Sequence, residues 1–287
     1  MNIIMAIVLG IFQGLTEFIP VSSSAHLIIV PWLLNWTDPV LTSLEFDISL
    51  HVGTLAAVIA FFYRDLWRLF LAGVASLKER KIGDDRDRKL AWMLVIGSIP
   101  GAIIGVLAES KIEELFHAPG EPPGMAAMVA MGVIIAILGG LLFWADRIGR
   151  QKRGLEKGTF KDALLIGLAQ ALAIFPGVSR SGATITAGLG LGLKREDAAR
   201  FSFLLSTPII LGGGLKSLVD IVQMSQESGF SAGSLGVFAA GMLAAGIAGF
   251  FCIKYLLRFL QKHSTDVFAY YRWGLAAVVI IAAILKG

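Results

Sequence analysis

Six stretches of the sequence are apolar for about 20 residues at a time, and their length constrains the fold more than any other feature. A helix of about 20 apolar residues crosses the hydrocarbon core of a bilayer. The composition agrees, because only 16% of the residues are charged, whereas soluble proteins carry about 25%. The sequence therefore predicts an all-α integral membrane protein with transmembrane helices near 48–63, 90–108, 126–145, 201–222, 235–253 and 267–285.

Two further apolar regions, 3–32 and 160–193, are interrupted near their middle by proline, glycine and serine. Irregular backbone persists at membrane depth only where protein or a watery cavity satisfies its peptide groups. We therefore expect each region to form a re-entrant helical hairpin, which enters the membrane and returns to the same side. A single full span over 3–32 is the alternative, and the uncharged residues 1–16 do not decide between the two.

Basic residues predict which side of the membrane each loop faces. The loops around 33–46, 109–125 and 223–234 hold one basic residue, Lys111. By contrast, 20 of the 25 lysines and arginines lie in four segments, 64–89, 147–161, 194–200 and 254–263. Because cytoplasmic loops are enriched in lysine and arginine, these four segments are expected in the cytoplasm and both termini outside.

The two interrupted regions match each other without gaps at an offset of 157 residues. Eight of the 19 positions from Gly10 to Ile28 are identical to their counterparts. The identities include a glutamine and two serines, so shared hydrophobicity does not explain them. An internal repeat is the simplest interpretation.

Each half then reads as one re-entrant hairpin followed by three transmembrane helices. An odd number of spans gives the halves opposite orientations, and inverted repeats of this kind place their functional site near the midplane between broken helices. We expect a single membrane domain, 1–287, with repeat 1 at about 1–146, repeat 2 at about 158–287 and a basic cytoplasmic linker, 147–161. The alternative is that the glycines and serines only allow close helix packing.

Three ionisable residues, Glu17, His26 and Arg180, lie inside the interrupted apolar regions. A charge at the bilayer centre costs about 2.5–3.5 kcal/mol on the insertion scale, so such residues mark functional sites by default. A purely structural Glu17–Arg180 ion pair is the alternative.

The residues around Arg180 suit a phosphate group. Helix-start N–H groups and hydroxyls bind phosphate, and an arginine can hold two phosphate oxygens at once. The expected phosphate-binding residues in this hairpin are Gly177, Ser179, Ser181 and Thr184, and those in the first hairpin are Ser22 and Ser24.

The first hairpin carries a different set of polar groups. Ser22, Ser23 and Ser24 precede His26, and a serine near a histidine is a candidate nucleophile with its base. Gln13 and Glu17 are four residues apart and share one helical face. Their oxygen atoms suit Mg²⁺ or Ca²⁺, but one carboxylate is too few for an all-protein site, so the metal is expected to arrive with a phosphorylated substrate.

The other polar residues have ordinary interpretations. Arg272 is expected near a helix end, where it can snorkel, as are Lys216 and Asp220. Asp47 and His51 begin the first full span, where they either border the site or cap the helix. No basic and aromatic pattern predicts nucleic-acid binding.

Three segments of the chain resemble the signature segments of bacterial undecaprenyl-diphosphate phosphatases of the bacitracin-resistance type. They are Gln13-x-x-x-Glu17, Pro20-Val-Ser-Ser-Ser-Ala-His26 and Pro176-Gly-Val-Ser-Arg-Ser-Gly-Ala-Thr184. The likeness extends to Phe46-Asp47…Gly53-Thr54 and to Phe201–Leu205, so it covers essentially the whole chain.

The resemblance implies hydrolysis of a C55 isoprenyl diphosphate, a lipid carrier of cell-wall synthesis, to the monophosphate and inorganic phosphate. It also implies a divalent cation, Mg²⁺ or Ca²⁺, and an active site open to the outer side of the cytoplasmic membrane. Gln13 and Glu17 match metal and diphosphate positions, and Ser23 and His26 match nucleophile or acid–base positions. Gln13 replaces a residue that is glutamate in some members, which leaves Glu17 as the essential carboxylate.

The expected mechanism has Ser23, deprotonated by His26, attack the terminal phosphorus while Arg180 and Glu17 with the cation stabilise charge. His26 as the nucleophile, or as the base for direct attack by water, stays open. The alternative function is a lipid-carrier flippase or secondary transporter, since inverted repeats with broken helices are typical of transporters. The expected partners are a polyprenyl diphosphate and membrane lipids, and a homodimer is left open.

Overall fold

The computed structural model describes residues 2–116, 124–228 and 232–286. Within these ranges the chain forms α-helices and two short 3₁₀ helices, with no β-strand. In chain order they are α1 (Asn2–Thr16), α2 (Ser23–Leu34), α3 (Leu44–Glu79), α4 (Arg86–Phe116), α5 (Met125–Ile148), η1 (Leu155–Lys157), α6 (Phe160–Ala171), η2 (Leu172–Ile174), α7 (Arg180–Gly190), α8 (Arg195–Ser228), α9 (Ala232–Leu260) and α10 (Asp266–Lys286).

Five helices in the described part of the chain are long and apolar enough to cross a membrane. They are α3, α4 over Arg86–Leu107, α5, α9 over Leu235–Leu260, and α10. Five of the predicted spans are thereby confirmed as apolar helices of sufficient length. The remaining prediction, 201–222, falls within α8, whose side chains from residue 213 onward lie outside the described ones.

Helix α3 is longer than the predicted span, because it continues to Glu79. Phe62 leaves helical geometry, with φ −102° and ψ 16°, so the helix bends at the end of the apolar stretch. The prediction stopped at residue 63 because Arg64 follows. A charge ends an apolar span but does not end a helix, and no proline follows to do so.

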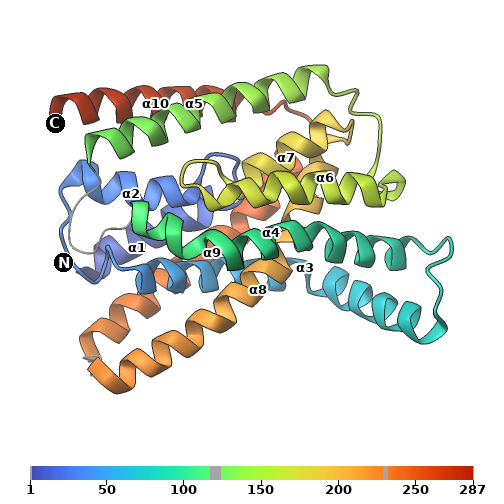
Figure 1. The fold of residues 1–287 in the computed structure, drawn as a ribbon, viewed down its shortest axis with the longest axis horizontal. Helices are drawn as coiled ribbons and strands as arrows, with labels where there is room; N and C mark the ends of the chain where they lie inside the picture. The colour runs from blue at the N-terminus through green and yellow to red at the C-terminus, as the bar shows by residue number, and fades with distance from the viewer. Residues whose placement is uncertain (1, 117–123, 229–231, 287) are drawn as a thin grey trace.

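The helices lie roughly side by side, with α5 and α10 packed together along one edge of the bundle (Figure 1). Helix α1 packs mainly against α9, and α6 packs mainly against α4. Both chain ends lie at one end of the molecule, and the α3–α4 and α5–α6 connections lie at the other (Figure 1). The basic segments 64–89 and 147–161 are therefore gathered away from the termini.

Both interrupted regions are broken helices, as predicted. A turn over residues 17–22 separates α1 from α2, and η2 with the loop 175–179 separates α6 from α7. The two breaks are locally alike. Ser22 and Ser179, 157 residues apart, are both N-cap residues with positive φ values of 79° and 68°.

The helices that lead into the two breaks also pack alike. A Cβ atom at Gly10 of α1 would meet the carbonyl oxygen of Gly241 in α9. A Cβ atom at Gly167 of α6, the matching position, would meet the carbonyl oxygen of Gly97 in α4. Glycine at each position thus lets two helix backbones approach closely, as small residues do in membrane helix pairs.

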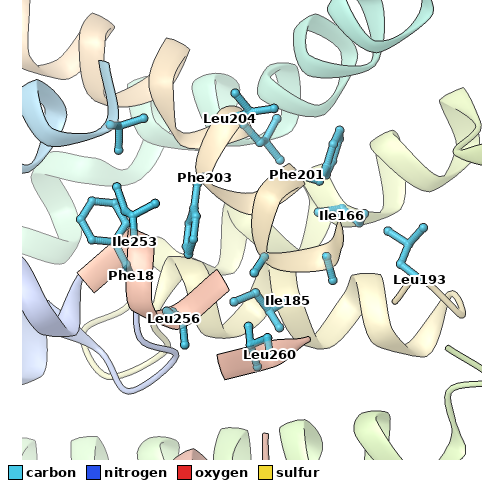
Figure 2. Packing of buried hydrophobic residues seen from close by; sticks show 14 of the residues in the cluster. Phe18, Ile166, Ile185, Leu193, Phe201, Phe203, Leu204, Ile253, Leu256 and Leu260 are labelled. Atoms are coloured by element: carbon cyan, nitrogen blue, oxygen red, sulfur yellow. The ribbon is translucent and has the colours of Figure 1, made fainter. Parts of the chain in front are cut away.

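The main apolar core lies beside the two breaks and connects them. Phe18, in the first turn, packs edge-on against Phe203 of α8 with ring centroids 5.3 Å apart. The same cluster contains Ile166 of α6 and Ile185 of α7, and Figure 2 shows these side chains around the segment of α8. Close packing of this core fixes the position of one hairpin relative to the other.

Candidate active site

Glu17 lies just beyond the last residue of α1, where the first hairpin turns, and its side chain is buried. Its Oε1 atom accepts a hydrogen bond from Arg180 Nη2 at 2.7 Å. Its Oε2 atom accepts from Ser23 Oγ at 2.6 Å and from Gln13 Nε2 at 3.1 Å. The Glu17 carboxylate thus joins the two hairpins. It brings together four of the predicted site residues, Gln13, Glu17, Ser23 and Arg180.

Ser23 and Arg180 occupy the same place in their respective hairpins. Each is the first residue of the second helix, α2 or α7, and each follows the capping serine of its hairpin. The two helix starts therefore point their first side chains at the two oxygens of one carboxylate. The geometry joins a hydroxyl from one half of the chain to a guanidinium from the other.

Arg180 has one nitrogen to spare. Its Nη2 binds Glu17, but its Nη1 is buried and has no hydrogen-bond partner among the described residues. A buried donor without a partner is costly and calls for an explanation. A phosphate oxygen at this position would supply the missing acceptor.

His26 does not pair with Ser23 as the sequence had suggested. Its Nδ1 atom lies 2.6 Å from the carbonyl oxygen of Ser22, and its Nε2 atom lies 2.7 Å from the hydroxyl oxygen of Tyr271 in α10. Both ring nitrogens are therefore engaged away from Ser23. The hydroxyl of Ser23 faces Glu17 instead, which is the acceptor best placed to take its proton.

The capping serines use their hydroxyls to shape the turns. Ser22 Oγ accepts from the Ala25 amide at 3.4 Å, and Ser179 Oγ accepts from the Gly182 amide at 3.1 Å. Such caps satisfy amide groups that the helix start leaves free. The hydroxyls of Ser24 and Ser181 lie 3.3 Å from those of their capping serines.

The remaining predicted phosphate-binding residues also stand within the second hairpin. Thr184 turns inward, with its hydroxyl 2.6 Å from Ser202 Oγ of α8. Ser181 donates to the carbonyl of Ile19 at 3.2 Å, which adds a second link between the hairpins. Gly177 has a φ of +95°, a value that favours glycine at the tip of the loop.

Arg272 corrects the sequence-based interpretation. It was expected to snorkel from a helix end, but it is completely buried. Its Nε donates to the carbonyl of Pro20 at 2.6 Å, and its Nη2 donates to the carbonyl of Val178 at 3.1 Å. One side chain thus binds the turns of both hairpins. The position of Arg272 in its helix could have indicated this burial, because Arg272 lies six residues after the start of α10. At about 1.5 Å per residue, this places it about 9 Å along the helix axis.

His51 belongs beside the site, a position that the sequence left undecided. Its Nε2 lies 3.8 Å from Glu17 Oε2, while its Nδ1 contacts the carbonyl oxygen of Asp47 at 2.8 Å. Helix α3 therefore brings an imidazole ring close to the same carboxylate. Of the two residues that could border the site, Asp47 and His51, the structure places His51 next to Glu17.

The residues present fit a cation that shares its coordination with a substrate. The described residues hold no cluster of three His, Cys, Asp or Glu side chains that could bind a metal ion by themselves. However, Gln13 Oε1 is buried next to Glu17, and no group in the described part of the chain is hydrogen-bonded to it. An amide oxygen and a carboxylate are hard ligands of the kind that Mg²⁺ and Ca²⁺ prefer, with phosphate oxygens completing the shell.

Taken together, these groups can support transfer of a phosphoryl group. A hydroxyl that is hydrogen-bonded to a buried carboxylate is a candidate nucleophile. A guanidinium at the same carboxylate can neutralise the charge on the oxygens of the transferred group. Both come from rigid helix starts, which suits precise positioning.

Comparison with known proteins adds a family to this geometry. The family model described as bacitracin resistance protein BacA matches residues 6–278. A protein of Moorella thermoacetica named undecaprenyl-diphosphatase is 45% identical over 280 residues, 98% of this chain and 97% of its own length. Proteins of the same name from Thermomicrobium roseum and Caldicellulosiruptor bescii are 44% and 43% identical, and the alignments cover at least 98% of each chain.

Proposed function

Because the chain belongs to the bacitracin resistance (BacA) family, we propose that it hydrolyses undecaprenyl diphosphate to undecaprenyl phosphate and inorganic phosphate. It is a membrane phosphatase, and its product is the lipid carrier that cell-wall synthesis uses again. The observation that carries the proposal is the meeting of Ser23 and Arg180 on Glu17, with Arg180 Nη1 left free for a phosphate oxygen.

Ser23 is the nucleophile in this proposal. Its Oγ attacks the terminal phosphorus and forms the O–P bond, while its proton passes to Glu17 Oε2. The bond from this phosphorus to the bridging oxygen breaks, and undecaprenyl phosphate leaves. Water then attacks the phosphoserine, the Oγ–P bond breaks, Glu17 returns its proton to Oγ, and inorganic phosphate is released.

Arg180 supplies electrostatic stabilisation. Negative charge spreads over the oxygens of the transferred phosphoryl group, and most of the catalysis of such reactions comes from positioned charges. Its Nη1–H groups face one of those oxygens while Nη2 keeps its contact with Glu17. The Glu17–Arg180 ion pair therefore also holds the guanidinium in place before the substrate arrives.

A divalent cation, Mg²⁺ or Ca²⁺, completes the proposed site. Glu17 and the free Oε1 of Gln13 would hold it together with diphosphate oxygens. When bound, the ion adds positive charge at the diphosphate and eases departure of the lipid phosphate.

We further propose that the two halves form an inverted repeat, with re-entrant hairpins and a site open to the outer side of the bacterial cytoplasmic membrane. The matching caps at Ser22 and Ser179, and the matching packing of Gly10 and Gly167, support the repeat. The repeats are about 1–146 and 158–287, in a single membrane domain. Both termini lie outside, and the linker 147–161 lies in the cytoplasm.

The lipid tail leaves the site sideways between spans and contacts membrane lipids, and a homodimer is compatible with this arrangement. A flippase or transporter has less in its favour. Transport does not require a serine hydroxyl hydrogen-bonded to a buried carboxylate.

The proposal is tested by incubating the protein, purified and returned to lipid vesicles, with undecaprenyl diphosphate. We expect inorganic phosphate and undecaprenyl phosphate in equal amounts from the wild type, and neither from a folded Arg180→Ala variant. Movement of the lipid across the vesicle membrane without release of phosphate would overturn the phosphatase and favour the transporter.

A further inference from the structure

His26 is buried between aromatic side chains from two other helices, α1 and α10. The side chain is buried, with 2% of it exposed. The ring of Phe12 from α1 stacks against it with centroids 6.1 Å apart, and the ring of Tyr271 from α10 stacks with centroids 5.7 Å apart. The imidazole is therefore clamped between two helices and cannot turn toward Ser23 without breaking these contacts.

The hydrogen bonds of this ring determine its tautomer. The Ser22 carbonyl oxygen, 2.6 Å from Nδ1, can only accept, so Nδ1 carries a proton. In the neutral imidazole Nε2 is then an acceptor, and the Tyr271 hydroxyl 2.7 Å away donates to it. A directed chain runs from the Tyr271 hydroxyl through the imidazole to the Ser22 carbonyl.

The end of this chain is a strained residue. Ser22 has φ 79° and ψ 98°, in a region that non-glycine residues seldom occupy. Such a conformation persists only where the surroundings hold it, and it is typical of functional sites. Ser22 is also the residue that directly precedes Ser23, so its peptide group sets where the Ser23 hydroxyl points.

The neighbour of Tyr271 acts on the same turn. Arg272 donates from Nε to the carbonyl of Pro20 at 2.6 Å. Two successive residues of α10 therefore hold two carbonyls of the first hairpin, Pro20 directly and Ser22 through His26. The hydrogen bonds and ion pairs of Glu17 within the described part of the chain come from other elements, so α10 acts on the turns. It acts on the first through Tyr271 and Arg272, and on the second through the bond from Arg272 to the Val178 carbonyl.

We propose that Tyr271 and His26 are positioning residues that hold the strained Ser22 peptide and thereby aim Ser23 at Glu17. This inference rests on the proposed function, in which Ser23 is the nucleophile. It differs from the expectation that His26 exchanges a proton with the nucleophile or the substrate. His26 works through a hydrogen bond that it donates from Nδ1.

Substitution of His26 by asparagine separates the two roles. The amide N–H of asparagine can replace the Nδ1–H donor but cannot act as a general base. Positioning predicts that His26→Asn keeps at least about tenfold more activity than His26→Ala, the scale of one hydrogen bond. Equal and complete loss in both variants would overturn the proposal.

Tyr271 is tested against its neighbour on the same helix. Tyr271→Phe removes the hydroxyl that binds Nε2, whereas Tyr270→Phe serves as a matched control, because Tyr270 packs against Phe143 and Trp273 away from His26. We expect Tyr271→Phe to lower kcat about tenfold with little change in KM, the scale of one lost hydrogen bond, and Tyr270→Phe to lower neither. An unchanged kcat in Tyr271→Phe would contradict the proposal.

A spectroscopic measurement does not depend on activity. The nitrogen chemical shifts of the imidazoles in ¹⁵N-histidine protein identify the tautomer of each ring, and the His26→Asn variant assigns the His26 signals. We expect the Nδ1–H tautomer for His26 in the wild type and a shifted Nε2 signal in Tyr271→Phe. The Nε2–H tautomer in the wild type would overturn the inference even if the enzyme hydrolyses its substrate. The Nδ1–H tautomer in a protein without phosphatase activity would instead leave the geometry intact and refute the proposed function.

Discussion

At the scale of single residues, the site depends on the fork of Arg180, which meets Glu17 with one nitrogen and leaves the other free. A lysine carries the same charge but cannot occupy both positions. We therefore expect Arg180→Lys to lower kcat/KM by about 10²–10³-fold, the usual cost of losing one stabilising donor. Steady-state phosphate release measures this, with Arg150→Lys in the exposed linker as the control. Activity within a few-fold of the wild type would show that charge alone suffices.

Variants of Ser23 and His26 distinguish nucleophilic attack by the serine from attack by His26 or by water. The Ser23 hydroxyl is hydrogen-bonded to Glu17, so Ser23→Ala removes the attacking group and should lower kcat by at least about a thousandfold. His26→Ala should leave residual turnover above that of Ser23→Ala, because His26 acts on the turn and not on phosphorus. Single-turnover phosphate release compares the two. Near-normal turnover of Ser23→Ala together with a dead His26→Ala would refute the serine route.

Glu17, His26 and Arg180 could be predicted as site residues because a charge inside an apolar segment needs a reason. Their hydrogen-bond partners could not be predicted from the sequence. Ser23 and His26 are close in sequence, yet the structure directs Ser23 to Glu17 and His26 to Tyr271. Arg272 and Tyr271 come from a helix more than 240 residues away in the chain, and only tertiary packing brings them to the turn.

At the scale of helices, close backbone contact holds α1 against α9. A Cβ atom at Gly10 would meet the Gly241 carbonyl oxygen, and overpacking of this kind costs about 1–3 kcal/mol. Gly10→Ala should therefore lower the thermal unfolding midpoint in detergent. Gly140→Ala on α5 is the matched control, since its added Cβ would meet nothing within 4 Å beyond the adjoining backbone of its own helix. It should leave the midpoint unchanged or raise it. Equal midpoints for both variants would mean that α1 has room to shift.

The helices themselves follow from the sequence more readily than their ends. Runs of apolar residues predicted α5 and α10 closely, whereas α4 and α9 continue past their predicted spans, to Phe116 and Leu260. Proline, glycine and serine marked both hairpin breaks. The end of α3 lies beyond the predicted span because hydropathy reports only where an apolar stretch ends. The helix continues to Glu79, with Leu69 in the apolar core and the Ser76 hydroxyl bonded to Trp92 of α4. The positive φ angles of Ser22 and Ser179 were not predictable from residue type, because serine seldom adopts them.

At the scale of the whole molecule, the proposed orientation places residues 33–46 outside and the linker 147–161 in the cytoplasm. The single cysteine, Cys252, is buried and is replaced by alanine to give a background without reactive thiols. Thr42→Cys should then react with a membrane-impermeant maleimide in intact cells. Lys152→Cys should react only after the cells are permeabilised. The opposite pattern would invert the topology and place the site on the cytoplasmic side.

In the proposed function, a carboxylate shared by two hairpins drives hydrolysis of a lipid diphosphate. Phosphate release from undecaprenyl diphosphate by wild type and by Glu17→Gln, each with and without EDTA, tests it most directly. Glutamine keeps the size and the hydrogen-bonding reach of Glu17 but removes its charge, so the variant should fold while its turnover falls at least about 100-fold. EDTA should abolish release by the wild type. Near wild-type turnover by a folded Glu17→Gln protein would contradict the account.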